Sequence, residues 1–134
     1  MGKGYFLNMG YQVIAPVGDN LKALFVGIKE FPTEMVHLIC PPKNRSDAEK
    51  LKKQLETFTI KSKIIEIDGN MMEEMFKTFG NLCSLYDNDN LIVNVATGDR
   101  MSTCAALSAA FANGLKAFGV MGRRCGCIGG AWRC

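Results

Sequence analysis

A short polar turn at residues 96–102 contains most of the side chains in this sequence that are able to bind a ligand. Thr97 and Ser102 offer hydroxyl groups, and Arg100 offers a planar guanidinium that holds a phosphate through two parallel hydrogen bonds. Gly98 permits a left-handed backbone or the close approach of a ligand. The turn is therefore a candidate site for an anion.

The segments on either side of this turn strengthen that interpretation. Residues 91–95 form a short apolar run typical of a buried strand, and residues 101–112 form a long run of small and apolar residues typical of a helix. At such a junction the free amides of residues 99–102 and the helix dipole favour an anion. Two simpler alternatives are that Asp99 only caps the helix, with Arg100 solvated, and that Asn94 ties the strand end to a neighbouring loop.

A second loop is predicted to lie beside this turn. Residues 11–16 form the first strand, and Gly18, Asp19 and Asn20 follow it. If the chain turns back after its third strand, the first and fourth strands become neighbours. The loops that leave them would then form one crevice at the carboxyl edge of the sheet.

The remaining segments predict regular alternation of strands and helices with short connections. This alternation requires right-handed crossovers and a sheet covered on both faces. We therefore expect a Rossmann-like α/β fold with a doubly wound, mainly parallel sheet of five or six strands in three α/β/α layers. The further strands are expected at 35–40, 63–67 and 115–120, and the further helices at 21–31, 46–58 and 71–85.

Composition limits the class of protein. The 134 residues are enough for one domain with a real core. A net charge of +3 is too small to indicate DNA binding by itself. No apolar run approaches the roughly 18 residues of a membrane span, and the first residues do not form a signal peptide. We expect a cytoplasmic protein with no membrane partner.

Common catalytic and cofactor motifs do not occur. There is no G-x-G-x-x-G, Walker, or G-x-S-x-G pattern and no spaced set of metal ligands, so we expect no cofactor and no metal. The one histidine, His37, is interpreted as a core or sheet-edge residue rather than a base. Cys40, Cys83 and Cys104 lie singly in apolar segments and are expected to act as small hydrophobic residues.

The pattern Asn-Val-Ala-Thr-Gly-Asp-Arg-Met-Ser at residues 94–102, with the Ala-rich helix and short strand that follow, resembles the CRISPR-associated Rossmann fold (CARF) domain. The resemblance is closest to the archaeal group in which this sensor domain precedes a winged helix-turn-helix. The opening strand and its Val-Gly-Asp-Asn loop fit the other ligand loop of that family. The resemblance covers residues 11–121 and implies a sensor domain over residues 1–122.

The resemblance implies a homodimer that binds a cyclic oligoadenylate second messenger across its two-fold axis, since a two-fold ring suits an isologous dimer. DNA would be bound only through a C-terminal domain missing here, which would regulate transcription. Asp99 departs from the expected pattern, because it places a negative charge where a phosphate should lie. The residues implied to bind the ligand are Gly18, Asp19, Asn20, Asn94, Thr97, Gly98, Asp99, Arg100, Met101 and Ser102.

Two other functions stay open from the residues. Some CARF domains cleave their ligand, and in that case Arg100 and Ser102 would position the ribose 2′-hydroxyl and stabilise charge, although a binding domain without catalytic residues is favoured. The second alternative is a plain dimerisation module, for which Met71, Met72 and Met75 are candidates for the dimer face.

The last residues, 123–134, do not fit the pattern of the domain. They read Arg-Arg-Cys-Gly-Cys-Ile-Gly-Gly-Ala-Trp-Arg-Cys and show no helix or strand periodicity, so we expect an atypical, disordered tail. Three cysteines without a fourth ligand give little support to a zinc site. We hypothesise that a frameshift or premature end removed a final strand and a C-terminal effector domain.

Overall fold

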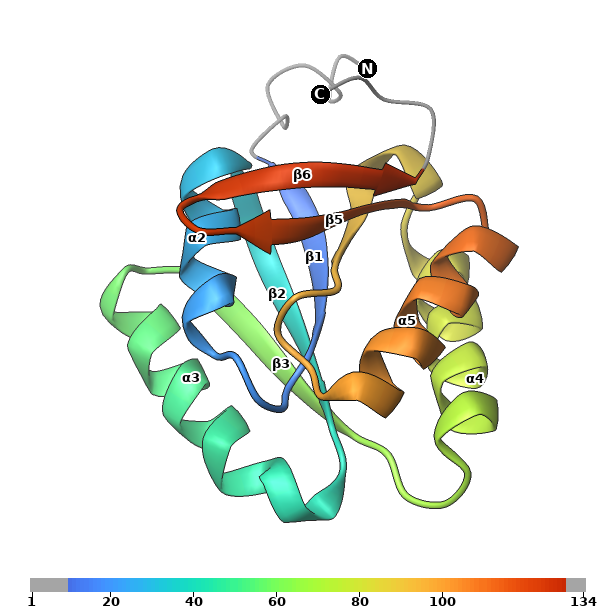
Figure 1. The fold of residues 1–134 in the computed structure, drawn as a ribbon. Helices are drawn as coiled ribbons and strands as arrows, with labels where there is room; N and C mark the ends of the chain where they lie inside the picture. Colours follow the sequence, from blue (N-terminus) through green and yellow to red (C-terminus); the bar gives the residue numbers. More distant parts are fainter. Residues whose placement is uncertain (1–9, 130–134) are drawn as a thin grey trace.

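The computed structural model describes residues 10–129, which form a six-stranded sheet in the order β3-β2-β1-β4-β5-β6 (Figure 1). Five strands are parallel, and only β6 runs antiparallel to its neighbour β5. The elements are β1 Tyr11–Pro16, α2 Lys22–Glu30, β2 Thr33–Cys40, η1 Pro42–Asn44, α3 Arg45–Thr57, β3 Lys61–Glu66, α4 Met71–Leu85, η2 Asn88–Asn90, β4 Leu91–Asn94, α5 Arg100–Ala112, β5 Lys116–Met121 and β6 Arg124–Gly129.

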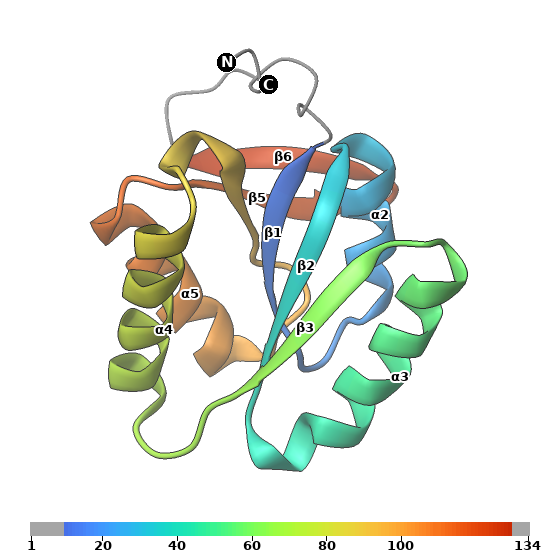
Figure 2. The same ribbon diagram turned by 180° about the vertical axis from the view of Figure 1, so that it is seen from behind.

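Helices cover both faces of the sheet. Helices α2 and α3 lie on one face, and α4 and α5 lie on the other (Figures 1 and 2). Each pair encloses its own apolar cluster against the sheet. The expected Rossmann-like fold with three α/β/α layers is therefore confirmed, with six strands. Within residues 10–129, no helix combines the length and the apolar character needed to cross a membrane.

The strand order brings the first and fourth strands together, as predicted. From β1 the chain moves outward through β2 to β3, and it then returns to place β4 on the other side of β1. Val13 of β1 is level with Ile92 of β4. The loops that follow these two strands therefore leave the sheet side by side at its carboxyl edge.

Small side chains let the helices approach the sheet closely. In α5 the buried positions include Ala105, Ala106, Ala109 and Ala110, all with no exposed surface. Gly27 lets α2 approach the sheet closely, because a Cβ atom there would lie 2.8 Å from the ring of Phe118 in β5. Close helix–sheet packing fixes the positions of the helix N-termini, which border the loops of the carboxyl edge.

Residues 124–129 differ from the expectation of a tail without regular structure. They form β6, which pairs with β5 after a two-residue turn at Gly122 and Arg123, where Gly122 has a φ of +66°. A positive φ at the first turn residue is typical of tight hairpins. The pattern was missed because Cys125 and Cys127, rather than β-branched residues, alternate along the strand. The expectation of a disordered tail was therefore wrong for residues 124–129, and residues 130–134 lie outside the described range.

The three singly placed cysteines do not share one environment. Cys40 is buried and Cys83 is half-buried, but Cys104 is exposed on α5. The expectation of a small hydrophobic core residue was therefore wrong for Cys104. Almost every residue of α5 is small or apolar, so its sequence does not mark which face meets the core.

His37 is a fully buried residue of β2 and so lies in the core, one of the two places, core or sheet edge, expected for it. Gln12 donates from Nε2 to Glu34 Oε1 at 3.0 Å, which leaves Gln12 Oε1 to accept from His37 Nε2 at 2.9 Å. Burial, assisted by the positive charge of Lys63, lowers the pKa of His37 from 6.5 to about 4. The imidazole is therefore neutral in the folded protein at neutral pH.

Acidification should destabilise the protein through His37. The unfolded chain takes up this proton near pH 6.5 and the folded chain only near pH 4, so stability is lost as pH falls through that window. From about pH 7 to about pH 5 the free energy of unfolding should fall by about 2 kcal/mol from this residue. Urea unfolding of wild type and His37→Gln at both pH values measures the difference. An equal pH dependence in the two proteins would contradict the assignment.

Candidate functional site

The loops that follow β1 and β4 are bonded to each other. The amides of Gly18 and Asn20 both donate to the carbonyl of Thr97, at 3.1 and 3.3 Å. In return, the Thr97 hydroxyl donates to the carbonyl of Pro16. We call residues 17–20 and 96–101 together the loop junction.

Two glycines allow this close contact. A Cβ atom on Gly18 would lie 2.4 Å from the amide nitrogen of Asp99, and one on Gly98 would lie 2.3 Å from Ser102 Oγ and 3.1 Å from the Cβ of Pro16. At Gly18 the space that a side chain would need is filled by the opposite loop, and at Gly98 it is filled by Ser102 and by Pro16 of β1. The lack of a side chain at Gly98 thus serves this packing, whereas the sequence suggested the close approach of a ligand there.

Asp99 caps helix α5, as the simpler alternative predicted. Its Oδ1 accepts from the amide of Ser102 at 2.8 Å, and its carbonyl accepts from the amide of Thr103 at 2.9 Å. The Ser102 amide in particular holds the pKa of Asp99 below its usual range. A carboxylate therefore already occupies the positive end of the helix, where the sequence suggested a phosphate.

Three of the residues predicted to bind a ligand are buried: Asn94, Thr97 and Ser102. Asn94 donates to the carbonyl of Ala23 at 3.2 Å and accepts from the amide of Ala96 at 3.0 Å. The Ser102 hydroxyl donates to the carbonyl of Asp99 at 3.3 Å. These side chains satisfy buried backbone groups and hold the junction in shape, so they do not face a ligand.

Four predicted residues do face solvent around the junction: Asp19, Asn20, Arg100 and Met101. Met101 is 60% exposed, which is unusual for a large apolar side chain. Of the pair considered for ligand cleavage, Arg100 is exposed and Ser102 is buried. The accessible chemistry of the junction is thus one guanidinium, one carboxylate, one amide and one apolar side chain.

A further cation near the junction was missed at the sequence level. Lys43 lies in η1, directly after β2, and its positive charge contributes to the lowered pKa of Asp99. The signal was present in the sequence, because the loop after the second strand leaves the same carboxyl edge of the sheet. Lys43 adds positive charge on the β2 side of the junction.

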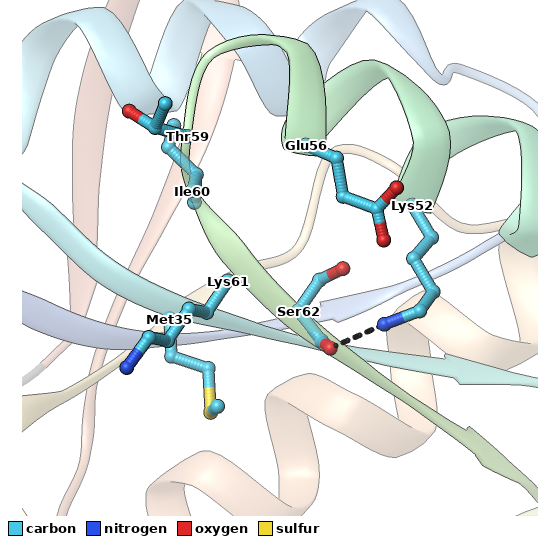
Figure 3. A pocket seen from close by; sticks show the side chains of 7 residues that line it. All are labelled: Met35, Lys52, Glu56, Thr59, Ile60, Lys61 and Ser62. Atoms are coloured by element: carbon cyan, nitrogen blue, oxygen red, sulfur yellow. Dashed lines mark hydrogen bonds between the residues drawn. The ribbon is translucent and has the colours of Figure 1, made fainter.

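A hollow of about 440 Å³ lies elsewhere, at the start of β2 and β3 (Figure 3). Within it, Lys52 Nζ donates to the carbonyl of Ser62 in β3 at 2.8 Å. The ammonium group of this lysine is therefore already bonded to the sheet. This is the amino edge, whereas ligands of open α/β sheets bind at the carboxyl edge. The lining residues are Met35, Lys52, Glu56, Thr59, Ile60, Lys61 and Ser62.

The tight contact of the two loops leads to a prediction about stability. Gly18→Ala should destabilise the fold by about 1–3 kcal/mol, because the new methyl group meets backbone atoms that cannot rotate away. Gly80→Ala is the matched control, since no atom lies within 4 Å of a Cβ atom there and alanine favours a helix by about 0.5–1 kcal/mol. Urea unfolding measures both. Equal stability of Gly18→Ala and wild type would show that the loops are not packed this closely.

Solved structures of other proteins share the fold of this chain. Can2 from Sulfobacillus thermosulfidooxidans, solved in complex with cyclic tetra-adenylate, superposes with a TM-score of 0.66 at 18% identity over 82% of this chain and 32% of its own. VC1899 from Vibrio cholerae superposes with a TM-score of 0.69 at 13% identity over 82% of this chain and 30% of its own. This chain thus spans about a third of each protein.

Sequence comparison identifies the family directly. No curated protein matches the sequence significantly. Residues 13–124 match the family described as "HFX_2341_N:-like, N-terminal". The matched range begins in β1 and ends at the first residue of β6, so it includes both loops of the junction. The chain therefore belongs to the HFX_2341_N:-like, N-terminal family.

Proposed function

We propose that this chain is a CARF-type sensor domain that binds a cyclic oligoadenylate across a homodimer. The output of such a sensor is regulatory, and in the archaeal group that the sequence resembles it is control of transcription in CRISPR-associated systems. DNA binding would be the task of a further domain. The proposal concerns binding, and no catalytic residue is assigned.

The observation that carries this proposal is the loop junction at the switch point of the sheet. Two loops from adjacent parallel strands are bonded together there, and exposed Asn20, Arg100 and Met101 surround the contact. A guanidinium binds phosphate, an amide bonds the edge of a base, and an apolar side chain packs against a base face. These are the contacts that a nucleotide ring requires.

One protein of the same fold supports this ligand class. Can2, which has the same fold, was solved with cyclic tetra-adenylate. Because Can2 is only 18% identical to this chain, the likeness shows the shared fold. That this chain binds the same class of ligand is our proposal. The turn Asn-Val-Ala-Thr-Gly-Asp-Arg-Met-Ser and its position beside the first loop provide the independent support.

The exposed face of α5 favours a homodimer. Met101, Cys104, Ser108 and Phe111 are exposed at helical spacing, and none of them is charged. Phe111 is 54% exposed, and the stripe begins at the loop junction. A helix face without charge is typical of a surface covered by a partner. Met75, one of the methionines considered for a dimer face, is instead completely buried.

A two-fold axis beside α5 would also explain how one ligand meets two sites. Because an isologous contact uses the same surface on both copies, α5 of one copy would pack on α5 of the other. The two Met101 residues and the two loop junctions would then lie near the axis. A cyclic ligand with two-fold symmetry would present the same groups to each copy.

Ligand binding should stabilise the protein, and Arg100 should be required. At about a hundred times its dissociation constant, cyclic tetra- or hexa-adenylate should add about 2.7 kcal/mol to the free energy of unfolding. Arg100→Ala should abolish most of this gain, whereas Lys53→Ala, a lysine exposed on α3, should keep it. Thermal unfolding with each ring, with linear oligoadenylate and with NAD measures the effect. No stabilisation of wild type by either ring would refute the proposed function.

The dimer face makes a separate prediction. Phe111→Glu should convert the dimer to a monomer, because it places a charge in an apolar contact. Phe58→Glu should remain dimeric, since Phe58 is 62% exposed but lies at the end of α3 on the other face of the sheet. Light scattering after gel filtration measures the mass. A short bis-maleimide should also join two copies through exposed Cys104, and Cys104→Ser should prevent it. A dimeric Phe111→Glu protein would exclude this face.

A further inference from the structure

We propose that Lys43 contacts a phosphate of the ligand, so that the loop after β2 forms a third side of the binding site. The proposal rests on the proposed function and names how this chain binds an anion beside the negative charge of Asp99. Neither the turn pattern nor the loop after β1 includes this residue.

The negative charge of Asp99 opposes the binding of a phosphate at the end of α5. Its carboxylate holds the amide of Ser102 at 2.8 Å and so takes up the end of α5. A phosphate placed on the same amides would meet this charge directly, and like charges repel strongly at short distance. The ligand phosphate must therefore be held by side chains that flank Asp99, and Arg100 is one of them.

The loop after β2 lies at the same edge as the junction. Pro16 at the end of β1 is level with Ile39 near the end of β2, and the amide of Val17 donates to the carbonyl of Ile39 at 2.8 Å. The two strands therefore end together, and η1 follows after Cys40 (Figure 1). Lys43 is the middle residue of η1 and is exposed.

The backbone around Lys43 is held by its own hydrogen bonds. The amide of Asn44 donates to the carbonyl of Pro41 at 3.0 Å, and the Asn44 side chain donates to Asp47 at 3.1 Å. Pro42 at the start of the turn restricts the backbone further. Less entropy is lost on binding when a loop is ordered beforehand.

The ammonium group of Lys43 is available to a ligand. Among the residues that the structure describes, it forms no ion pair and no hydrogen bond through its side chain. Arg45, two residues further on, is in contrast bonded to Glu49 at 3.0 Å and Glu66 at 3.4 Å. Of these two neighbouring cations, only Lys43 is free to bind an anion.

The charge of Lys43 reaches the loop junction. It is one of the groups that hold the pKa of Asp99 below its usual range, although the Ser102 amide has the larger effect. Asp99 thus has Lys43 within electrostatic reach from the loop after β2 and the exposed Arg100 next to it in the chain. A phosphate that bridges the two cations would stay clear of the helix amides and gain two charge-assisted contacts.

The first test compares Lys43→Ala with Lys53→Ala, which removes the same charge from a distant part of the surface. Affinity for cyclic tetra-adenylate is measured by calorimetry at several salt concentrations. Lys43→Ala should bind roughly tenfold more weakly, and loss of one phosphate contact should reduce the slope of log affinity against log salt by about 0.7. Lys53→Ala should match wild type in both measurements.

A second background separates contact with the ligand from simple neutralisation of Asp99. Asn caps helices as well as Asp does, so Asp99→Asn keeps the cap and removes the charge. If Lys43 contacts phosphate, Lys43→Ala should still weaken binding roughly tenfold in the Asp99→Asn protein. If its only effect is to neutralise Asp99, the loss should disappear there, and this result would overturn the proposal.

The outcomes distinguish this inference from the proposed function. If wild type binds and Lys43→Ala keeps the same affinity and salt dependence, the role of Lys43 is refuted while the sensor function stands. If wild type binds neither cyclic tetra- nor hexa-adenylate, the proposed function fails and Lys43 has no such ligand to contact. Circular dichroism of each variant confirms that the fold is intact.

Discussion

The packing of one loop directly on another, Gly18 against Gly98 and Asp99, is the contact on which the candidate site depends. Backbone atoms meet here at distances that leave no space for a methyl group, so the geometry of each loop constrains the other. The contact is possible only because β1 and β4 are neighbours in the sheet. The strand order therefore determines that these two loops meet at the carboxyl edge of the sheet.

Buried polar side chains maintain this junction. The amide of Asn94 links the end of β4 to the first turn of α2, and the hydroxyl of Thr97 links the second loop to the end of β1. These bonds also give the buried side-chain polar atoms of Asn94 and Thr97 their partners, and an unpaired buried polar group is costly. Exposed side chains, such as Arg100 and Met101, are therefore interleaved with buried polar side chains within residues 94–102.

This alternation explains what the sequence predicted well and what it did not. The order and type of the elements through β5 followed from hydrophobic periodicity, and the neighbourhood of the two loops followed from winding. The residue type alone does not show that Arg100 is exposed while Thr97 and Ser102 are buried. Each of these polar side chains is able to bond either a ligand or a backbone group. The missed β6 has a related cause, since its cysteines and glycines are not typical strand formers, although Cys125 packs against the core like a small apolar residue.

The electrostatic arrangement could not be predicted from the sequence, because its charged groups come from two loops that are far apart in the chain. Asp99 is adjacent to Arg100 in the chain, and read alone it argues against an anion site. Lys43, which precedes it by more than fifty positions, changes the balance of charge at the same edge. In the proposed site, Asp99 caps its own helix, and the phosphate would be held by the Arg100 and Lys43 side chains rather than by the helix amides. Under this proposal Asp99 would act in specificity, since it would favour a ligand whose phosphates reach these two cations over one that needs the end of the helix.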